Sequence, residues 1–394
     1  MQEHTIPHLA DKLHCTGCGA CANGCPKGAI HMLPDREGFL HPTVTDACIQ
    51  CGHCSHICPV LKRRELRPEP TAFAVWNPDE ESRRLSGAGG VFSLLAEFIL
   101  DDGGVVFGAA MDESLRVRHI SIRSKSEIHR LRGAKLVQSE IGDCYKQVRH
   151  QLDCGRRVLF TGTPCQVDGL YRYLGEHPEN LLTCDVLCGG APSPGVWEQM
   201  VRSMAYIKQK KPLSVSFCAK LEGERERRFR VEFEGGTAYD APLSKSEYGL
   251  GLQQRLFLRP SCHTCPYAKC DRVGDLSIGY YRGLPKDFLP EEQKKGISLL
   301  LVNSVKGAHM FDTLPLKKEK RPLSEAMAAN AALSAPVPPA ENRDAFFDAF
   351  SRQSFQQVRR QFLCTSPLPV GRKSGDRPSG KKFTFPRIFR KKEK

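Results

Sequence analysis

The chain has 394 residues, of which 40% are hydrophobic and 26% are charged, and its formal net charge is +14. It is long enough for two or three domains with hydrophobic cores, and its composition is that of an ordinary water-soluble protein. The first thirty residues contain no secretory hydrophobic segment, and no apolar run reaches the roughly 18 to 20 residues that span a bilayer. We therefore expect a cytoplasmic protein whose cysteines hold metal and do not form disulfides.

Two cysteine runs with identical spacing occur near the N-terminus. Each reads C-x2-C-x2-C-x3-C-P, and the runs begin at Cys15 and at Cys48. In bacterial ferredoxins with this spacing, three cysteines of a run bind one 4Fe-4S cluster and the fourth binds the other cluster. Two complete copies argue against zinc or disulfides. The predicted ligands are Cys15, Cys18, Cys21 and Cys58 for one cluster (site I) and Cys48, Cys51, Cys54 and Cys25 for the second (site II).

A ferredoxin domain is therefore predicted over residues 1–64, followed by a polar, proline-containing linker. In residues 71–210, segments of strand type alternate with segments of helical spacing, which is typical of an α/β domain with a mostly parallel sheet. Strands are expected at 71–76, 105–109, 117–122, 157–161 and 181–187, and helices at 91–100, 125–131, 143–152, 166–174 and 193–208.

The pattern changes after Pro212. Two segments there alternate with a period of two, and Gly235-Gly236 is a typical hairpin turn, so we expect an antiparallel insertion. The fold class is thus α+β or α/β: a bacterial-type ferredoxin domain, then an α/β domain with a mostly parallel sheet and an antiparallel insertion. The predicted elements of the C-terminal part, residues 211–363, are strands at 214–220, 228–234 and 297–302 and helices at 324–334 and 344–362.

Residues 365–394 form a basic tail. They contain ten Lys and Arg against Asp376 and Glu393, so this segment carries eight of the fourteen excess positive charges. The tail has no periodicity, and we expect it to be disordered. Its mixture of basic and aromatic residues also allows a weak contact with an anionic membrane surface, although an ordinary solvated tail explains it too.

Two further cysteines, Cys165 and Cys188, lie just after predicted strands. In Gly162-Thr163-Pro164-Cys165-Gln166, Thr163 can cap the next helix, and Cys165 then lies in its first turn. Cys188 ends the next strand, at the sheet edge where open α/β folds bind ligands.

Cys262-x2-Cys265 is a loop that supplies two ligands. Together with Cys165 and Cys188 it can form a third 4Fe-4S site. Two other interpretations remain open: the first two cysteines are small buried apolar residues, or the later pair binds zinc with Cys270 or His263.

The glycine-rich turn Ser86-Gly-Ala-Gly-Gly90 precedes a predicted helix. Backbone N–H groups at such a position can bind a phosphate or a flavin pyrophosphate. It is not a G-x-G-x-x-G motif, and by pattern alone a flexible turn is the preferred explanation.

Several short motifs occur in an order that resembles one known family. After the cysteine runs come Ser86-x2-Gly89-Gly90, Leu131-Arg-Gly-Ala-Lys135-Leu-Val-Gln138-Ser139, Gly162-Thr-Pro-Cys-Gln166, Arg259-Pro-Ser-Cys262-x2-Cys265 and Gly274-Asp275-x2-Ile278-Gly279. Over about residues 10 to 310, the chain resembles the coenzyme F-420 hydrogenase/dehydrogenase beta subunit family, in its bacterial form with an N-terminal two-cluster ferredoxin domain.

The resemblance implies an iron-sulfur protein with FAD or another flavin, which passes electrons between clusters and a hydride-accepting cofactor. In this mechanism Lys135 is expected near the flavin as a catalytic residue that stabilises its reduced anion, although a solvated surface lysine explains it equally well. The resemblance also implies a third 4Fe-4S cluster at Cys165, Cys188, Cys262 and Cys265 (site III). The implied cofactor-binding residues are Ser86, Gly89, Gly90, Lys135, Gln138, Ser139, Gly162 and Thr163.

Two segments depart from the family pattern. The family's Ser-Lys-Tyr segment reads Ala-Lys135-Leu here, and the Gly-Asp-Phe-Trp-Gly of bacterial relatives reads Gly279-Tyr-Tyr-Arg-Gly283. The second departure, at Tyr280 and Arg282, removes an acid and an indole near the implied cofactor region, so it bears on flavin retention and on the hydride partner.

The sequence thus predicts an iron-sulfur flavoprotein oxidoreductase. Its expected partners are a redox protein or ferredoxin and a small-molecule hydride carrier. One alternative is a non-enzymatic electron-transfer subunit of polyferredoxin type without flavin, which flavin content would distinguish. A second alternative is a metal-containing nucleic-acid-binding protein. Against it, aromatic content is 8% and no nucleic-acid-binding motif is recognisable, so we expect no nucleic-acid partner.

Overall fold

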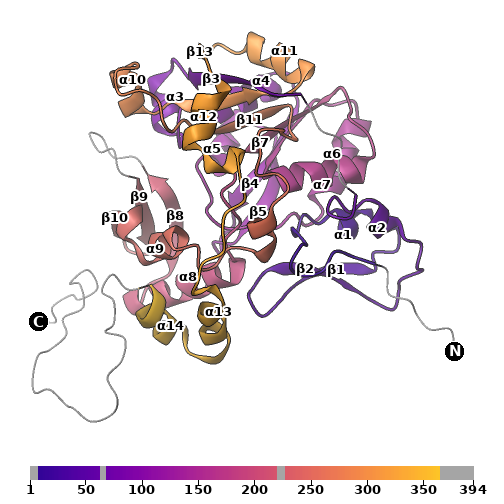
Figure 1. Ribbon diagram of the computed structural model, residues 1–394, viewed down its shortest axis with the longest axis vertical. Helices are drawn as coiled ribbons and strands as arrows, with labels where there is room; N and C mark the ends of the chain where they lie inside the picture. Colours follow the sequence, from indigo (N-terminus) through magenta and orange to yellow (C-terminus); the bar gives the residue numbers. More distant parts are fainter. Residues whose placement is uncertain (1–7, 63–67, 220–226, 364–394) are drawn as a thin grey trace, which may run out of the picture.

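The computed structural model describes residues 8–62, 68–219 and 227–363. Its largest element is a sheet with the strand order β13-β3-β12-β11-β7-β6-β4-β5, which lies in the upper half of Figure 1. The strands are β3 (Thr71–Trp76), β4 (Val105–Met111), β5 (Val117–Ile122), β6 (Val158–Gly162), β7 (Leu181–Val186), β11 (Leu276–Tyr280), β12 (Ser298–Val302) and β13 (Lys317–Arg321).

The centre of this sheet is parallel, as predicted, because β11, β7, β6 and β4 pair in parallel. The flanking pairs are antiparallel, so the sheet as a whole is mixed. The short connection between β4 and β5 explains why this pair is antiparallel. Only residues 112–116 join these two strands, and such a short connection permits antiparallel pairing alone.

Helices cover both faces of the sheet. Side chains alternate along each strand, so Val106 and Leu159 pack with the helices of one face, whereas Phe107 and Phe160 pack with those of the other. The first face carries α4 (Val91–Asp101), α5 (Ile128–Leu131) and α11 (Val305–Thr313), and the second carries α6 (Cys144–Asp153), α7 (Pro164–Leu174) and α12 (Leu323–Ala329).

A second core surrounds the predicted antiparallel insertion, which is confirmed as a three-stranded sheet. Trp197, Phe217, Phe229 and Tyr248 pack against one another inside it. Its elements are β8 (Pro212–Ala219), β9 (Arg228–Phe233), β10 (Thr237–Pro242), α8 (Pro194–Lys208), α9 (Glu247–Gln253), α13 (Arg343–Arg352) and α14 (Phe355–Phe362).

The prediction of one helix over 344–362 is wrong, because α13 and α14 are separate helices. Gln353 is extended, and Ser354 forms a capping box with Gln357 that starts α14. An apolar periodicity that continues through the break concealed this capping signal.

The ferredoxin elements are α1 (Ala20–Gly24), β1 (Ile30–Pro34), β2 (Leu40–Val44) and α2 (His53–His56). Figure 1 shows them in indigo beside α6 and α7, and α1 packs against both of these helices. Phe39, directly before β2, is fully buried in the second core. The ferredoxin domain is thus packed firmly onto the rest of the fold.

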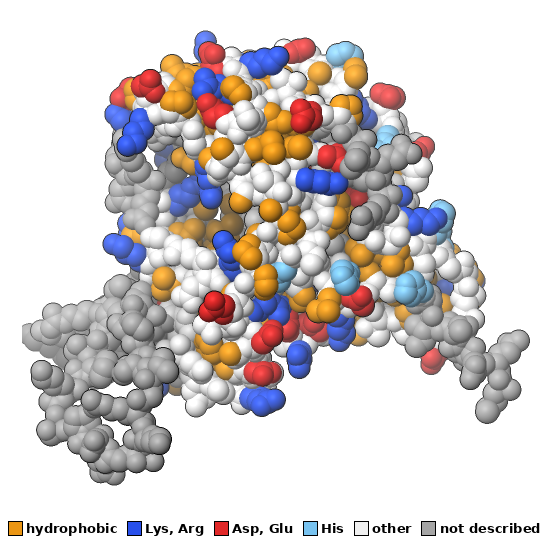
Figure 2. All heavy atoms as spheres, in the orientation of Figure 1, with side chains coloured by type: hydrophobic (Ala, Val, Ile, Leu, Met, Phe, Trp, Pro, Cys, Tyr) orange, Lys and Arg blue, Asp and Glu red, His pale blue; other side chains and the backbone are white. Residues whose placement is uncertain are grey.

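Three further short helices are α3 (Glu80–Arg84), α10 (Pro290–Lys295) and a 3-10 helix over Pro260–Thr264. Within the described ranges, no helix has the length and apolar character needed to cross a membrane. On the face shown in Figure 2, acidic and basic side chains are interspersed. The predicted basic tail and its membrane contact lie outside the described residues.

Candidate functional site

The structure brings the four cysteines of site I together. Burial raises the pKa of the Cys18 thiol to about 12, and the nearby charges of Cys15 and Cys58 also raise it. Burial likewise raises the pKa of Cys21, and Cys18, Cys15 and Cys58 add to this rise. These mutual effects require the four sulfurs to be close neighbours. The last cysteine of the second run therefore lies with the first three cysteines of the first run.

The surroundings of site I fit a 4Fe-4S cluster. Gly17 and Gly19 adopt positive φ angles of 67° and 76°, which turn the chain tightly around the sulfurs. Backbone N–H groups of Gly17 and Ala20 donate to Cys15 and Cys18. The buried side chain of Thr16 hydrogen-bonds to the Cys18 sulfur, which acts against the larger effect of burial on the pKa of that thiol. Such donors stabilise thiolate and sulfide around a cluster.

The four cysteines of site II line one small cavity together with Pro26, Lys27, Ile30, Ile49 and Gly52. The N–H of Ala29 donates to Cys25 Sγ at 3.2 Å, and the N–H of Gln50 donates to Cys48 Sγ at 3.4 Å. Cys51 is exposed, whereas Cys15 and Cys18 of site I are buried. Site II therefore lies closer to solvent than site I.

The four cysteines of site III also come together, from three distant segments. Burial raises the pKa of the Cys165 thiol, and the charges of Cys188, Cys265 and Cys262 contribute. Burial raises the pKa of Cys188 to about 11, and Cys265 contributes there too. In residues 8–62, 68–219 and 227–363, no group of three or more His, Cys, Asp or Glu is placed to hold a single metal ion. The cysteines of a cubane, in contrast, bind different irons.

Hydrogen-bond donors also surround site III. The N–H of Ala191 donates to Cys262 Sγ at 3.2 Å, and the Thr163 hydroxyl lies 3.1 Å from Cys165 Sγ. Thr163 and Gln166 form a capping box, so Cys165 is in the first turn of α7 as predicted. His263, a ligand in the zinc alternative, contacts the Val337 carbonyl through Nδ1 at 2.9 Å. The donor set fits a 4Fe-4S cluster.

Sites I and III are neighbours across helix α7. A Cβ added to Gly169 of α7 would lie 3.1 Å from Cys18 Sγ. Tyr145 and Tyr267 are both buried, and the charges of Cys18 and Cys165 raise the pKa of each, after the larger effect of burial. Nothing in the sequence pattern singled out these two tyrosines.

Arg259 joins site I to site III. Its side chain is fully buried, and Nε donates to the Cys15 carbonyl at 2.7 Å. Its own carbonyl accepts from the Cys262 N–H at 3.0 Å. Gly17 has a positive φ, which favours glycine, and a Cβ there would lie 2.8 Å from the Arg259 Nη1 atom. The motif Arg259-Pro-Ser-Cys262 was visible in the sequence, but the role of its arginine was not.

The predicted glycine turn has a clear packing role. The N–H of Gly89 donates to Ser298 Oγ at 2.8 Å, and a Cβ on Gly89 would lie 2.5 Å from the Val75 carbonyl. Gly90 has φ 82° and precedes α4 without a side-chain cap. Next to it, Asn77 Nδ2 is buried and lacks a hydrogen-bond partner in the described part of the chain. Sequence reasoning missed Asn77.

Ser86 begins this turn, and Lys135 follows Arg132, whose side chain contacts Ser93 of α4. Ser86 Oγ donates to the Ser82 carbonyl at 2.7 Å. The Lys135 ammonium group donates to the carbonyls of Arg132 at 2.8 Å and Arg130 at 3.1 Å. Burial lowers the pKa of Lys135 to about 7. Burial lowers the pKa of His119 to about 4, with a smaller contribution from the charge of Lys135.

The other predicted flavin residues lie at the cluster sites. Gln138 Nε2 donates to the Thr16 carbonyl at 2.9 Å. Gln166 Nε2 donates to Ser139 Oγ at 3.0 Å, and its Oε1 accepts from the Thr163 N–H, next to Gly162, at 3.0 Å. Because Arg132 Nε donates to Ser93 Oγ of α4 at 2.9 Å, residues 131–139 run from the glycine-turn region to the clusters.

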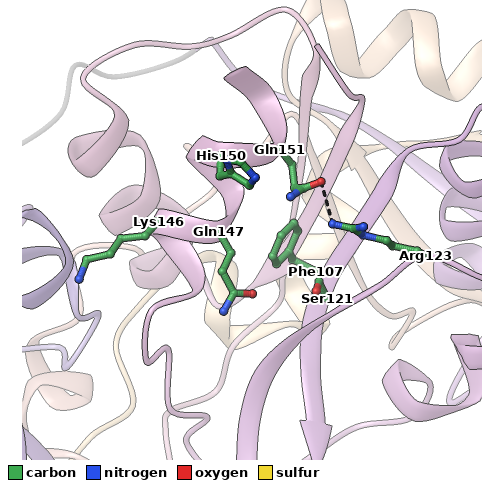
Figure 3. Close-up of a pocket in the computed structure, with 7 residues that line it drawn as sticks. All are labelled: Phe107, Ser121, Arg123, Lys146, Gln147, His150 and Gln151. Carbon is green, nitrogen blue, oxygen red and sulfur yellow. Dashed lines mark hydrogen bonds between the residues drawn. The ribbon is translucent and has the colours of Figure 1, made fainter. Parts of the chain in front are cut away.

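A larger cavity of about 380 Å³ lies elsewhere, between the β4–β5 edge of the sheet and α6 (Figure 3). Arg123 Nη2 donates to Gln151 Oε1 there at 3.1 Å. None of the predicted site residues lines it. The lining residues are Phe107, Ser121, Arg123, Lys146, Gln147, His150 and Gln151.

The departure at Gly279–Gly283 lies where β11 ends. Tyr280 is 40% exposed, and the Arg227 guanidinium stacks 4.4 Å from its ring centre. Tyr281 is buried and donates to Glu325 Oε1 at 2.8 Å. The Tyr280 ring at the end of β11 is thus paired with a cation from another part of the chain.

Comparisons with known proteins agree with this arrangement. A family model for the C terminus of the beta subunit of coenzyme F420 hydrogenase/dehydrogenase matches residues 155–321, and a 4Fe-4S dicluster domain matches residues 14–62. The chain is 25% identical to one subunit of the F(420)H(2) dehydrogenase of Methanosarcina mazei over 292 residues, which cover 69% of this chain and 78% of that protein.

Two further similarities are more distant. The coenzyme F420-dependent sulfite reductase of Methanocaldococcus jannaschii is 26% identical over 183 residues, 43% of this chain and 27% of that protein. One chain in a solved F420-reducing NiFe hydrogenase complex from Methanosarcina barkeri aligns with a TM-score of 0.46 and 17% identity, over 75% of this chain and 92% of that chain. Residues 155–321 thus belong to the C-terminal domain of the coenzyme F420 hydrogenase/dehydrogenase beta subunit family, and a ferredoxin-type 4Fe-4S dicluster domain over residues 14–62 precedes it.

Proposed function

We propose that this chain is an iron-sulfur flavoprotein subunit of an oxidoreductase, which passes electrons between a redox partner protein and a hydride-accepting cofactor. The contiguity of sites I and III across α7 carries the proposal. The charges of Cys18 and Cys165 both raise the pKa of the same two buried tyrosines, Tyr145 and Tyr267, after the larger effect of burial. The family supports oxidoreductase chemistry, since two relatives are an F420H2 dehydrogenase subunit and an F420-dependent sulfite reductase.

When bound, a 4Fe-4S cluster exchanges single electrons and a flavin exchanges the two electrons of a hydride. The residues of this chain provide the surroundings for that chemistry. Thiols from Cys15 to Cys58 and from Cys165 to Cys265 supply the ligands. The packing of α1 against α6 and α7 holds site I beside α7, the helix that carries Cys165 of site III. In this scheme a partner protein approaches site II, where Cys51 is exposed.

The flavin in this proposal lies along residues 131–139. The uncapped first turn of α4 after Gly90 offers backbone N–H groups to a pyrophosphate, and the unpartnered Asn77 Nδ2 adds a further donor. Lys135, with its pKa near 7, can carry a positive charge that favours a reduced flavin anion. Gln138 and Ser139 lie at the other end of the segment, beside the clusters.

Anaerobic reconstitution followed by iron, sulfide and flavin analysis tests the proposal. Three clusters correspond to about twelve irons per chain, accompanied by one flavin. About eight irons without flavin would instead support a plain electron-transfer subunit. A zinc content that matches the cysteine sets would contradict both readings.

A further inference from the structure

We propose that Arg259 raises the reduction potentials of the clusters at sites I and III through its buried positive charge. The inference rests on the proposed function, since it takes these sites to hold 4Fe-4S clusters. It adds a role for one residue that ligates neither cluster, and it makes the potentials, not activity, the measured quantity.

The guanidinium of Arg259 lies between the ferredoxin domain and the rest of the fold, and its strong contacts are with neutral acceptors. Nε donates to the Cys15 carbonyl at 2.7 Å, Nη2 to the Leu40 carbonyl at 2.9 Å and Nη1 to Gln138 Oε1 at 3.0 Å. The ring nitrogens of His41, whose partner is Asp35, lie 3.3 and 3.4 Å from Nη2. Asp35 is thus separated from the guanidinium by the imidazole.

Arg259 differs in this respect from the other buried arginines of the described residues. Each of the others forms an ion pair with a carboxylate: Arg83 with Glu292, Arg272 with Asp185, Arg343 with Glu37 and Arg359 with Glu247. Arg259 is the most completely buried of the five, and in the described part of the chain it has no carboxylate partner. A buried cation without a counter-charge is costly. The anionic clusters on either side would supply the missing negative charge.

Arg259 is in direct contact with ligands of both cluster sites. Its Nε donates to the carbonyl of Cys15, a ligand of site I, and its own carbonyl accepts from the N–H of Cys262, a ligand of site III, at 3.0 Å. A buried positive charge in this position favours negative charge at sites I and III.

The same preference applies to cluster reduction. Reduction adds one electron to a cluster and therefore one negative charge. A fixed cation in a medium of low dielectric stabilises this charge more than it would in water. The contacts of Arg259 include none of the ligands of site II, namely Cys25, Cys48, Cys51 and Cys54, so that cluster serves as an internal reference.

The test is a redox titration of the reconstituted full-length protein with dithionite and mediators, followed by low-temperature electron paramagnetic resonance. Arg259→Gln should lower the midpoint potentials of two clusters, each by at least a tenfold change in the reduced-to-oxidised ratio, which is about 59 mV for a one-electron couple. The third potential should stay unchanged, and Cys51→Ser identifies it as that of site II. Arg259→Lys, which keeps the charge, should retain most of the native potentials.

A matched control separates charge from docking. Arg343 also bridges the ferredoxin domain, through Glu37, and its Nε donates to the Leu258 carbonyl next to Arg259 at 3.1 Å. The double variant Glu37→Gln/Arg343→Gln removes this ion pair with no change in net charge, so the potentials should not shift. An equal shift in the control, or unchanged potentials in fully loaded Arg259→Gln, would overturn the proposal.

If Arg259→Gln does not assemble, Gln138→Glu carries the test. It places a carboxylate against Nη1, so it should lower the same two potentials, and unchanged potentials would again overturn the inference. Iron analysis distinguishes the two proposals. Eight irons per chain would mean that site III holds no cluster, which would contradict the proposed function. The effect of Arg259 on the potential of site I could still be measured.

Discussion

Gly38 and Gly195 touch backbone to backbone. A Cβ added to Gly38 would lie 2.5 Å from the Gly195 Cα atom, and one added to Gly195 would lie 2.7 Å from the Gly38 Cα atom. Gly38 is in the turn between β1 and β2, with φ 82°, and Gly195 is in the first turn of α8. The contact presses the ferredoxin hairpin onto the second core and directs Phe39 into it.

Gly195→Ala should therefore destabilise the protein. In an ordinary helix this substitution stabilises by roughly 0.5 to 1 kcal/mol, but here the added methyl group meets backbone that cannot move independently. We expect a lower melting temperature and faster proteolysis between the ferredoxin domain and β3. Gly87→Ala is the control, because a Cβ there meets no atom within 4 Å. Equal melting temperatures for the two variants would contradict this reading of the contact.

Cys165→Ser should remove about four irons per chain, because it takes one ligand from site III. Cys270→Ser and His263→Gln should leave the iron content intact, since neither residue belongs to that site. Iron and zinc analysis of the reconstituted variants checks this. Zinc lost from Cys270→Ser or His263→Gln, with iron unchanged in Cys165→Ser, would favour the zinc alternative.

Tyr267→Phe should lower the free energy of unfolding by about 1 to 3 kcal/mol, because a buried carboxylate loses a hydrogen bond. The Tyr267 hydroxyl donates to Asp168 Oδ2 at 2.8 Å, and both side chains are buried. Denaturant titration of the cluster-free protein measures the loss. Tyr280→Phe, on an exposed ring, should change stability little, and a comparable loss there would point to a general effect of the substitution.

Lys135 should make stability depend on pH. Its folded-state pKa of about 7 lies below the usual 10.5, so between these values the unfolded chain binds more protons and stability rises with pH. The free energy of unfolding of the native protein, relative to that of Lys135→Met, should therefore increase between pH 7 and 9. The increase should be less than the limiting ~1.4 kcal/mol per pH unit, because Lys135 is only partly shielded from water. Denaturant titrations at several pH values measure it. Exposed Lys12, changed to Met, should show no such trend; a flat difference for Lys135 would contradict its lowered pKa.

The cysteine spacing and the strand periodicities carried most of what the sequence could predict. Strands such as β6 and β12 and helices such as α4 have strong local patterns, and they form where the patterns place them. The β13 edge strand was missed because every residue of Lys317–Arg321 is charged, and only pairing with β3 makes it a strand.

Other features depend on contacts between residues far apart in the chain. Arg259 hydrogen-bonds to Cys15, which is 244 positions away in the sequence, and Tyr267 hydrogen-bonds to Asp168, which is 99 positions away. No local spacing encodes such pairs. Asn77 stands out only because the finished fold leaves its amide nitrogen unpartnered in the described structure. The sequence could thus indicate which sulfurs serve as ligands, but not which neutral and charged groups surround them.

The three attachments of the ferredoxin domain, at Gly38, Glu37 and Cys15, argue against a swinging carrier. Some redox proteins move a tethered domain back and forth to ferry electrons between distant stations. Here such travel would have to pull Phe39 out of its core and break both arginine contacts on every cycle. In the proposed function, electrons therefore pass between sites that stay fixed, and turnover should be insensitive to solvent viscosity at every step except partner encounter.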